Sequence, residues 1–142
     1  AGPGEDEQGD ITAIFTVLVA GSDMDEPVAD ILRGVLDGHV VLERAIAERG
    51  RFPAIDLMRS VSRSLPMAAT PTENAQIAEA RRLIGAWERV EMMVQAGLYA
   101  QGSDPLTDRA IKLFSRLDGF LGGQGAKSPM ESFARLRKAL EG

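Results

Sequence analysis

Few residues of this 142-residue chain have types and spacing that suit chemistry. His39 is the only histidine, and there is no cysteine. No serine-nucleophile motif accompanies His39, so the residues that a catalytic triad requires are absent. Arg63 carries a planar guanidinium that can hold two phosphate oxygens at once. Taken alone, however, the residues favour an ordinary surface or ion-paired arginine at this position.

Acidic side chains gather in one short segment and raise the question of a metal site. They are Asp23, Asp25, Glu26 and Asp30. Asp25 is explained as a helix cap and Glu26 by the favourable charge at a helix N-terminus. No second ligand cluster is visible in the sequence, so we predict no metal site.

Phe52 precedes Pro53, and the proline restricts the backbone on which the ring is carried. The π-face of a phenylalanine can stack on a base, but an ordinary core role is the simpler interpretation of the residue alone. Tyr99 is open to the same two interpretations, stacking or plain packing.

Composition places the chain among ordinary globular proteins, with 44% apolar and 26% charged residues. The net charge of −5 argues against a nucleic-acid binder, which needs a basic surface. The lack of cysteine is compatible with the cytoplasm, which is the location we expect. No apolar run approaches the roughly 20 residues of a membrane span.

The first half of the chain has an α/β pattern. Ile11–Val19 is almost continuously apolar and β-branched, which predicts a strand covered on both faces. A helix is predicted over Glu26–Leu36 and a shorter one over Glu43–Arg49, with strands at His39–Leu42 and around Ala54–Ile55. The pattern of 57–65 is ambiguous. A buried strand needs neighbours for its backbone groups, so these few strands indicate one piece of a larger sheet.

The second half is predicted to be helical. Thr70 and Glu73 form a capping box that opens a helix to about Ala96, and Asp104 precedes a helix that runs to about Leu121. A glycine-rich linker follows at 122–125. Ser128 and Glu131 form a second capping box before a last helix.

Several segments, in this order and spacing, resemble the flagellar and type III secretion export branch of the rotary ATPases. They are DITAIFTVLV (10–19), SDMDEPVAD (22–30), LDGHVVL (36–42) with FPAID (52–56), SVSR (60–63) and GLYAQGSDP (97–105). The resemblance covers about residues 1–120, and Asp10 stands where the family usually carries serine. The family's phosphate-binding motif, G-x-x-x-x-G-K-[ST], does not occur here.

This resemblance implies an α/β fold, namely the trailing part of a RecA-like P-loop nucleotide-binding domain (1–67) followed by a small all-α carboxy-terminal bundle (68–142). It implies that Arg63 is the catalytic arginine finger, reaching the ATP of a neighbouring subunit. Phe52 with Pro53 and, from the bundle, Tyr99 would contact the adenine. ATP and magnesium would be held mainly by the upstream half of the domain, and the isolated segment would be inactive.

The implied partners are five further copies in a homohexamer, the export stalk protein, chaperones and their cargo. Membrane association would be peripheral, through the export apparatus. Two alternatives remain open: a stand-alone helical module that binds chaperones or the stalk protein, and the injectisome version of the same ATPase. The segment Gly102–Pro105 favours the flagellar branch.

Overall fold

The computed structural model describes residues 12–19, 31–32 and 34–141, and it divides the chain into two compact units, Ala1–Val35 and Leu36–Gly142. In the first unit the predicted strand Ile11–Val19 is wrong over 12–19, which have no regular secondary structure. Ile14 and Leu18 are more than nine-tenths exposed. The physical reason is the one already noted, since a strand forms only where another strand pairs with it.

The predicted helix Glu26–Leu36 lies only in part within the described residues. Residues 31, 32, 34 and 35 are helical, which agrees with the prediction where it can be compared. Ile31 and Val35, expected on the apolar face, are 65% and 76% exposed.

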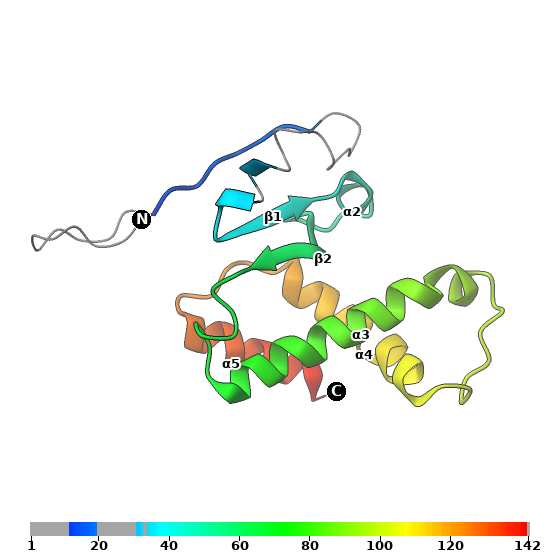
Figure 1. Cartoon of the computed structure of the whole chain (residues 1–142). Helices are drawn as coiled ribbons and strands as arrows, with labels where there is room; N and C mark the ends of the chain where they lie inside the picture. Colours follow the sequence, from blue (N-terminus) through cyan, green and yellow to red (C-terminus); the bar gives the residue numbers. More distant parts are fainter. Residues whose placement is uncertain (1–11, 20–30, 33, 142) are drawn as a thin grey trace, which may run out of the picture. The chain divides into compact units, whose positions relative to one another are not determined.

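The second unit begins with an antiparallel pair of strands, β1 (Gly38–Leu42) and β2 (Ile55–Ser62), joined through the short helix α2 (Arg44–Glu48) (Figure 1). The strand at β1 and the helix at α2 confirm the sequence predictions. β2 is longer than expected and includes most of the ambiguous stretch 57–65. Val41 and Ile46 supply the buried apolar side chains of this part.

The two strands do not pair evenly. His39 lies opposite Val61 and Val41 opposite Asp56, so β2 bulges between these pairs. Ser60 stabilises the bulge, because its hydroxyl accepts a hydrogen bond from the Val41 amide (3.0 Å) and donates one to the Asp56 carbonyl. The bulge accommodates the extra residues of β2 and determines where the chain leaves the strand.

Three helices form the rest of the unit: α3 (Pro71–Gln95), α4 (Pro105–Leu121) and α5 (Pro129–Leu140). In Figure 1, α3 and α4 run side by side, α5 lies against them, and β2 lies over α3. No helix among the described residues is long and apolar enough to cross a membrane.

The apolar faces of these helices meet in one core. Leu83, Leu113 and Leu117 are each only 1% exposed. The buried members of the core are Ala80, Leu83, Ile84, Ala86, Ala110, Leu113, Leu117, Leu136 and Ala139. Trp87 and Phe114 stack beside it, with ring centroids 4.4 Å apart.

The helix starts follow their predicted signals, with one correction. Thr70 and Glu73 form the expected capping box of α3, and Asp104 caps α4. At α5 the hydroxyl of Ser128 accepts from the Glu131 amide, but the Glu131 carboxylate accepts from the Lys127 amide (2.9 Å) instead of closing the box. This hydrogen bond is the main reason why the pKa of Glu131 lies below its usual value.

The first testable prediction concerns the cap of α3. Thr70→Ala removes the acceptor for the Glu73 amide, and we expect it to lower the free energy of unfolding by about 1 kcal/mol. Thr72→Ala is the matched control, since Thr72 is exposed within the first turn and is not the cap. Urea unfolding of both variants measures the difference, and equal stabilities would contradict the capping role.

Candidate functional site

Arg63 follows β2 immediately and is exposed. Its amide donates a hydrogen bond to the Asp37 carbonyl (2.8 Å), which fixes the backbone where the chain leaves the sheet. The structure therefore presents this guanidinium at the surface from a position defined by the strand pair, not from a long loop.

Phe52 lies in the turn that precedes β2, and its side chain is 64% exposed. This exposure disagrees with the simpler interpretation of Phe52 as an ordinary core residue. Phe52 and Arg63 flank opposite ends of β2, so one chain presents the ring and the guanidinium at two separate places.

An open groove of about 780 Å³ lies beside the Phe52–Pro53 turn, and Pro53 is part of its wall. Its other walls are the end of α4, the glycine-rich linker and α5. Pockets for small ligands usually have volumes of 300–1,000 Å³ and mostly apolar walls. The residues that line it are Pro53, Arg116, Gly119, Phe120, Leu121, Gly123, Gln124, Gly125, Ala126, Ser132, Arg135, Lys138 and Ala139.

Tyr99 lies elsewhere. Its hydroxyl donates a hydrogen bond to the Asp108 carboxylate (3.0 Å) in the first turn of α4, and the same carboxylate accepts from the Gly102 amide. The Phe52 carbonyl, in contrast, lies beside Gly122 at the other end of α4. At 1.5 Å per residue these two ends are about 20 Å apart, so the two aromatic residues do not face each other within one chain.

The linker and Phe120 line the open groove, and no pattern in the sequence indicates it. The turn between Arg51 and Ala54 packs against residues near 122, although some 70 positions separate them in the chain. A β-carbon added at Gly122 would lie 3.2 Å from the Arg51 Cγ and 3.7 Å from the Phe52 carbonyl oxygen. The glycines of 122–125, interpreted as a flexible linker, also allow this close approach; no local signal reveals the contact.

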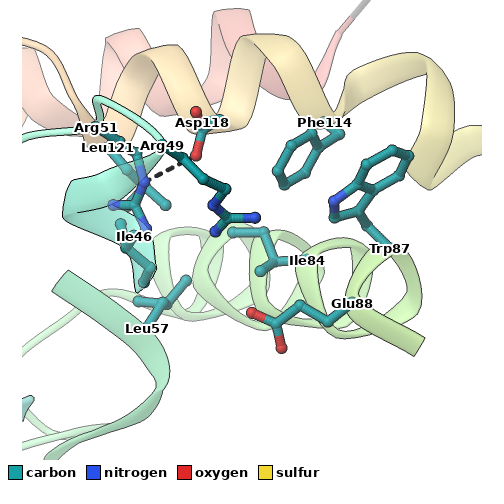
Figure 2. A pocket seen from close by; sticks show the side chains of 10 residues that line it. All are labelled: Ile46, Arg49, Arg51, Leu57, Ile84, Trp87, Glu88, Phe114, Asp118 and Leu121. Atoms are coloured by element: carbon teal, nitrogen blue, oxygen red, sulfur yellow. Dashed lines mark ion pairs between the residues drawn. The ribbon is translucent and has the colours of Figure 1, made fainter. Parts of the chain in front are cut away.

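Arg51 is a deeply buried charged side chain of this region, and no local signal in the sequence indicates its role. Figure 2 shows the Nε of Arg51 next to Asp118 of α4, and both side chains line a small cavity of about 20 Å³. The Arg51 Nε and the Asp118 Oδ1 form an ion pair of 2.8 Å without hydrogen-bond geometry, and the Arg51 side chain is only 8% exposed. The same guanidinium donates to the carbonyls of Ile55 (2.9 Å) and Pro53 (3.4 Å).

Glu88 lies on the wall of the same cavity, at its α3 side (Figure 2). Partial burial, followed by repulsion from Asp56, raises the pKa of the Glu88 carboxyl above its ordinary value, while Arg49 and Arg51 act in the opposite direction. Two arginines and two carboxylates thus line the cavity between the α/β segment and the bundle.

No group of three histidine or acidic side chains that could hold a metal occurs within the described ranges. The acidic cluster Asp23, Asp25, Glu26 and Asp30 lies outside those ranges, so its prediction stays untested. His39 has a structural contact, because its Nε2 donates to the Arg59 carbonyl across the strand pair (3.1 Å).

Two protein families match consecutive parts of the chain. Residues 1–62 match the nucleotide-binding domain of the ATP synthase alpha/beta family, and residues 69–141 match the C-terminal domain of the EscN ATPase of type III secretion systems. The second match covers half of the chain.

Curated relatives include proteins of both the flagellum and type III secretion. The flagellum-specific ATP synthase of Caulobacter vibrioides is 47% identical over 92% of this chain and 30% of its own length. The SPI-2 type 3 secretion system ATPase of Salmonella typhimurium is 43% identical over 83% of this chain and 27% of its own length. The chain therefore spans less than a third of these relatives.

Solved structures agree with this assignment. The assembled ATPase EscN of the enteropathogenic E. coli type III secretion system superposes with a TM-score of 0.87 at 36% identity, over 94% of this chain and 33% of that protein. EscN in complex with its central stalk EscO gives 0.71 at 34% identity, over 80% and 29%. With its α/β segment followed by the EscN-type helical domain, this chain belongs to the family of flagellar and type III secretion export ATPases.

Proposed function

We propose that this chain is part of an ATPase that hydrolyses ATP in a homohexameric ring to drive flagellar, type III protein export. The exposure of Arg63 directly after β2 is the observation that carries the proposal, because a cation in that position can reach across a subunit interface. ATP and magnesium would be bound mainly by the part of the relatives' length that lies outside these 142 residues. The injectisome version of the ATPase is the alternative, since relatives of both kinds match.

In this proposal Arg63 is the arginine finger. Charge accumulates on the γ-phosphate oxygens as the phosphoryl group is transferred, and a guanidinium held against them stabilises that charge. The hydrogen bond from the Arg63 amide to Asp37 supports the role, since it fixes the base of the finger.

Phe52 with Pro53 would form one wall of the adenine site. The ring is exposed and lies at the turn that borders the open groove, where Phe120 supplies a second aromatic side chain. Because Phe52 and Arg63 flank opposite ends of β2, the proposal assigns them to two nucleotides, one bound by the same subunit and one by its neighbour. Tyr99 is left out of the adenine site, because its hydroxyl is held at the far end of α4.

Partners follow from the same assignment. A stalk protein, chaperones and their cargo would meet the helical domain, and the ring would associate with the membrane only through the export apparatus. The relative solved with its central stalk supports the first of these partners. The rival proposal is a stand-alone binding module. Loss of ATP turnover in the variants tested below would decide against it, and unchanged turnover would favour it.

The arginine finger is tested in the full-length ATPase that contains this segment. Arg63→Ala should leave ATP binding intact and lower kcat by about 10³-fold or more, because the transition-state charge loses its counter-ion. Arg59→Ala is the matched control, since Arg59 lies on the same strand and pairs with Glu43 within the chain (2.9 Å). If Arg63→Ala retains turnover within a few-fold of the parent, the finger role is wrong.

The adenine wall predicts a different kinetic signature. Phe52→Ala should raise the KM for ATP by about 5- to 150-fold, the equivalent of the roughly 1–3 kcal/mol of one base stacked on an aromatic ring, and should change kcat little. Phe52→Tyr keeps the ring and should keep the KM near that of the parent. A loss of kcat at unchanged KM would count against stacking.

The 142 residues by themselves should not hydrolyse ATP, because they contain no G-x-x-x-x-G-K-[ST] loop to hold the phosphates. A phosphate-release assay on the purified chain, with the full-length protein as the positive control, checks this. Turnover by the isolated chain at a rate comparable with the full-length protein would overturn the proposal that the phosphates are bound mainly outside these 142 residues.

A further inference from the structure

The Arg51 guanidinium joins three groups that belong to different parts of the fold. It pairs with Asp118 near the end of α4, and it donates hydrogen bonds to the carbonyl of Pro53 in the turn and to that of Ile55 at the start of β2. A planar fork can satisfy several acceptors in fixed directions, which an ammonium group cannot do. Arg51 therefore holds the shape of the turn and its position on α4 at the same time.

Phe52 cannot hold its own position by burial, because most of its ring is exposed. Its backbone lies against Gly122, where a β-carbon would already be 3.7 Å from the Phe52 carbonyl oxygen. The placement of the ring therefore depends on the contacts of its neighbours, and Arg51 makes the most strongly buried of these.

A second ion pair provides a comparison within the same molecule. Arg49 pairs with Glu91 of α3 (3.0 Å), so it also joins the α/β segment to the bundle. The Arg49 side chain is 47% exposed, however, and exposed pairs contribute little to stability. Arg51 is 8% exposed, and a buried charge that loses its partner is strongly destabilised.

We infer that Arg51 and Asp118 are a positioning pair, which fixes the Phe52–Pro53 wall of the nucleotide site against helix α4 of the carboxy-terminal domain. This inference rests on the proposed adenine role of Phe52 and assigns a further function to the helical domain. Helix α4 becomes part of the mechanism that sets nucleotide affinity, although neither member of the pair needs to touch the nucleotide.

The test compares Asp118→Asn with Glu91→Gln, two variants that each remove one charge from an inter-segment pair. In the 142-residue chain, Asp118→Asn should speed hydrogen–deuterium exchange in the peptide that spans 50–56, while Glu91→Gln should leave it unchanged. In the full-length ATPase, Asp118→Asn should weaken ADP binding and raise the KM for ATP by about 3-fold or more, but not above the increase caused by Phe52→Ala, because it acts through the same stacking contact. It should leave kcat at saturating ATP within a few-fold.

Arg51→Lys separates charge from geometry. The lysine keeps the attraction to Asp118 but loses the fork that binds the Pro53 and Ile55 carbonyls, so we expect it to raise the KM as well. A variant that retains the parent exchange rate and KM would show that the pair needs only a positive charge and would overturn the role of the fork.

The outcomes distinguish this inference from the proposed function. If Phe52→Ala raises the KM and Asp118→Asn changes only the melting temperature, the positioning role fails and the adenine wall stands. If Phe52→Ala leaves the KM unchanged, the adenine wall and the positioning role fail together. If Glu91→Gln has the same effect as Asp118→Asn, burial is not what matters, and the inference is again overturned.

Discussion

The constraint on which the arrangement depends is the burial of one arginine between two parts of the chain. A guanidinium removed from water requires a counter-charge and hydrogen-bond acceptors. Arg51 has its counter-charge in Asp118, and its two terminal nitrogens donate to the carbonyls of Pro53 and Ile55. The Asp118 carboxylate is within reach only when α4 ends beside the turn into β2. Satisfying the charge therefore determines the register between the strand pair and the bundle, and apolar packing alone would leave that register less defined.

The strand pair has a corresponding constraint of its own. Hydrogen bonds of Ser60 and Asp56 stabilise the bulge in β2, and the bulge decides at which residue the chain leaves the sheet. Ion pairs and side-chain hydrogen bonds thus fix both ends of β2, one at the turn with Phe52 and one at Arg63. For the proposed roles of Phe52 and Arg63 at two nucleotides, such fixed ends matter more than the length of the strand.

The sequence predicted those features that depend on neighbouring residues. The caps at Thr70 and Asp104 and the three helices after them were predicted correctly, because caps and apolar periodicity are local signals. The strand predicted at 11–19 is not formed over the described residues 12–19, because pairing depends on residues far away in the sequence. For the same reason the sequence did not reveal the Arg51–Asp118 pair or the contact at Gly122. The family was evident from ordered short segments, whereas the site depends on long-range contacts that only the fold displays.

Trp87 makes the junction between the strand pair and the bundle observable by fluorescence. It is the single tryptophan of the chain, and it stacks on Phe114 at the edge of the cavity that also holds Arg51 and Asp118 (Figure 2). Its indole N–H is buried and has no hydrogen-bond partner among the described residues, and the cavity of about 20 Å³ is large enough for one water molecule. The emission wavelength of this one fluorophore therefore responds to wetting at the junction of strand pair and bundle, so loosening of that junction is visible without any added dye.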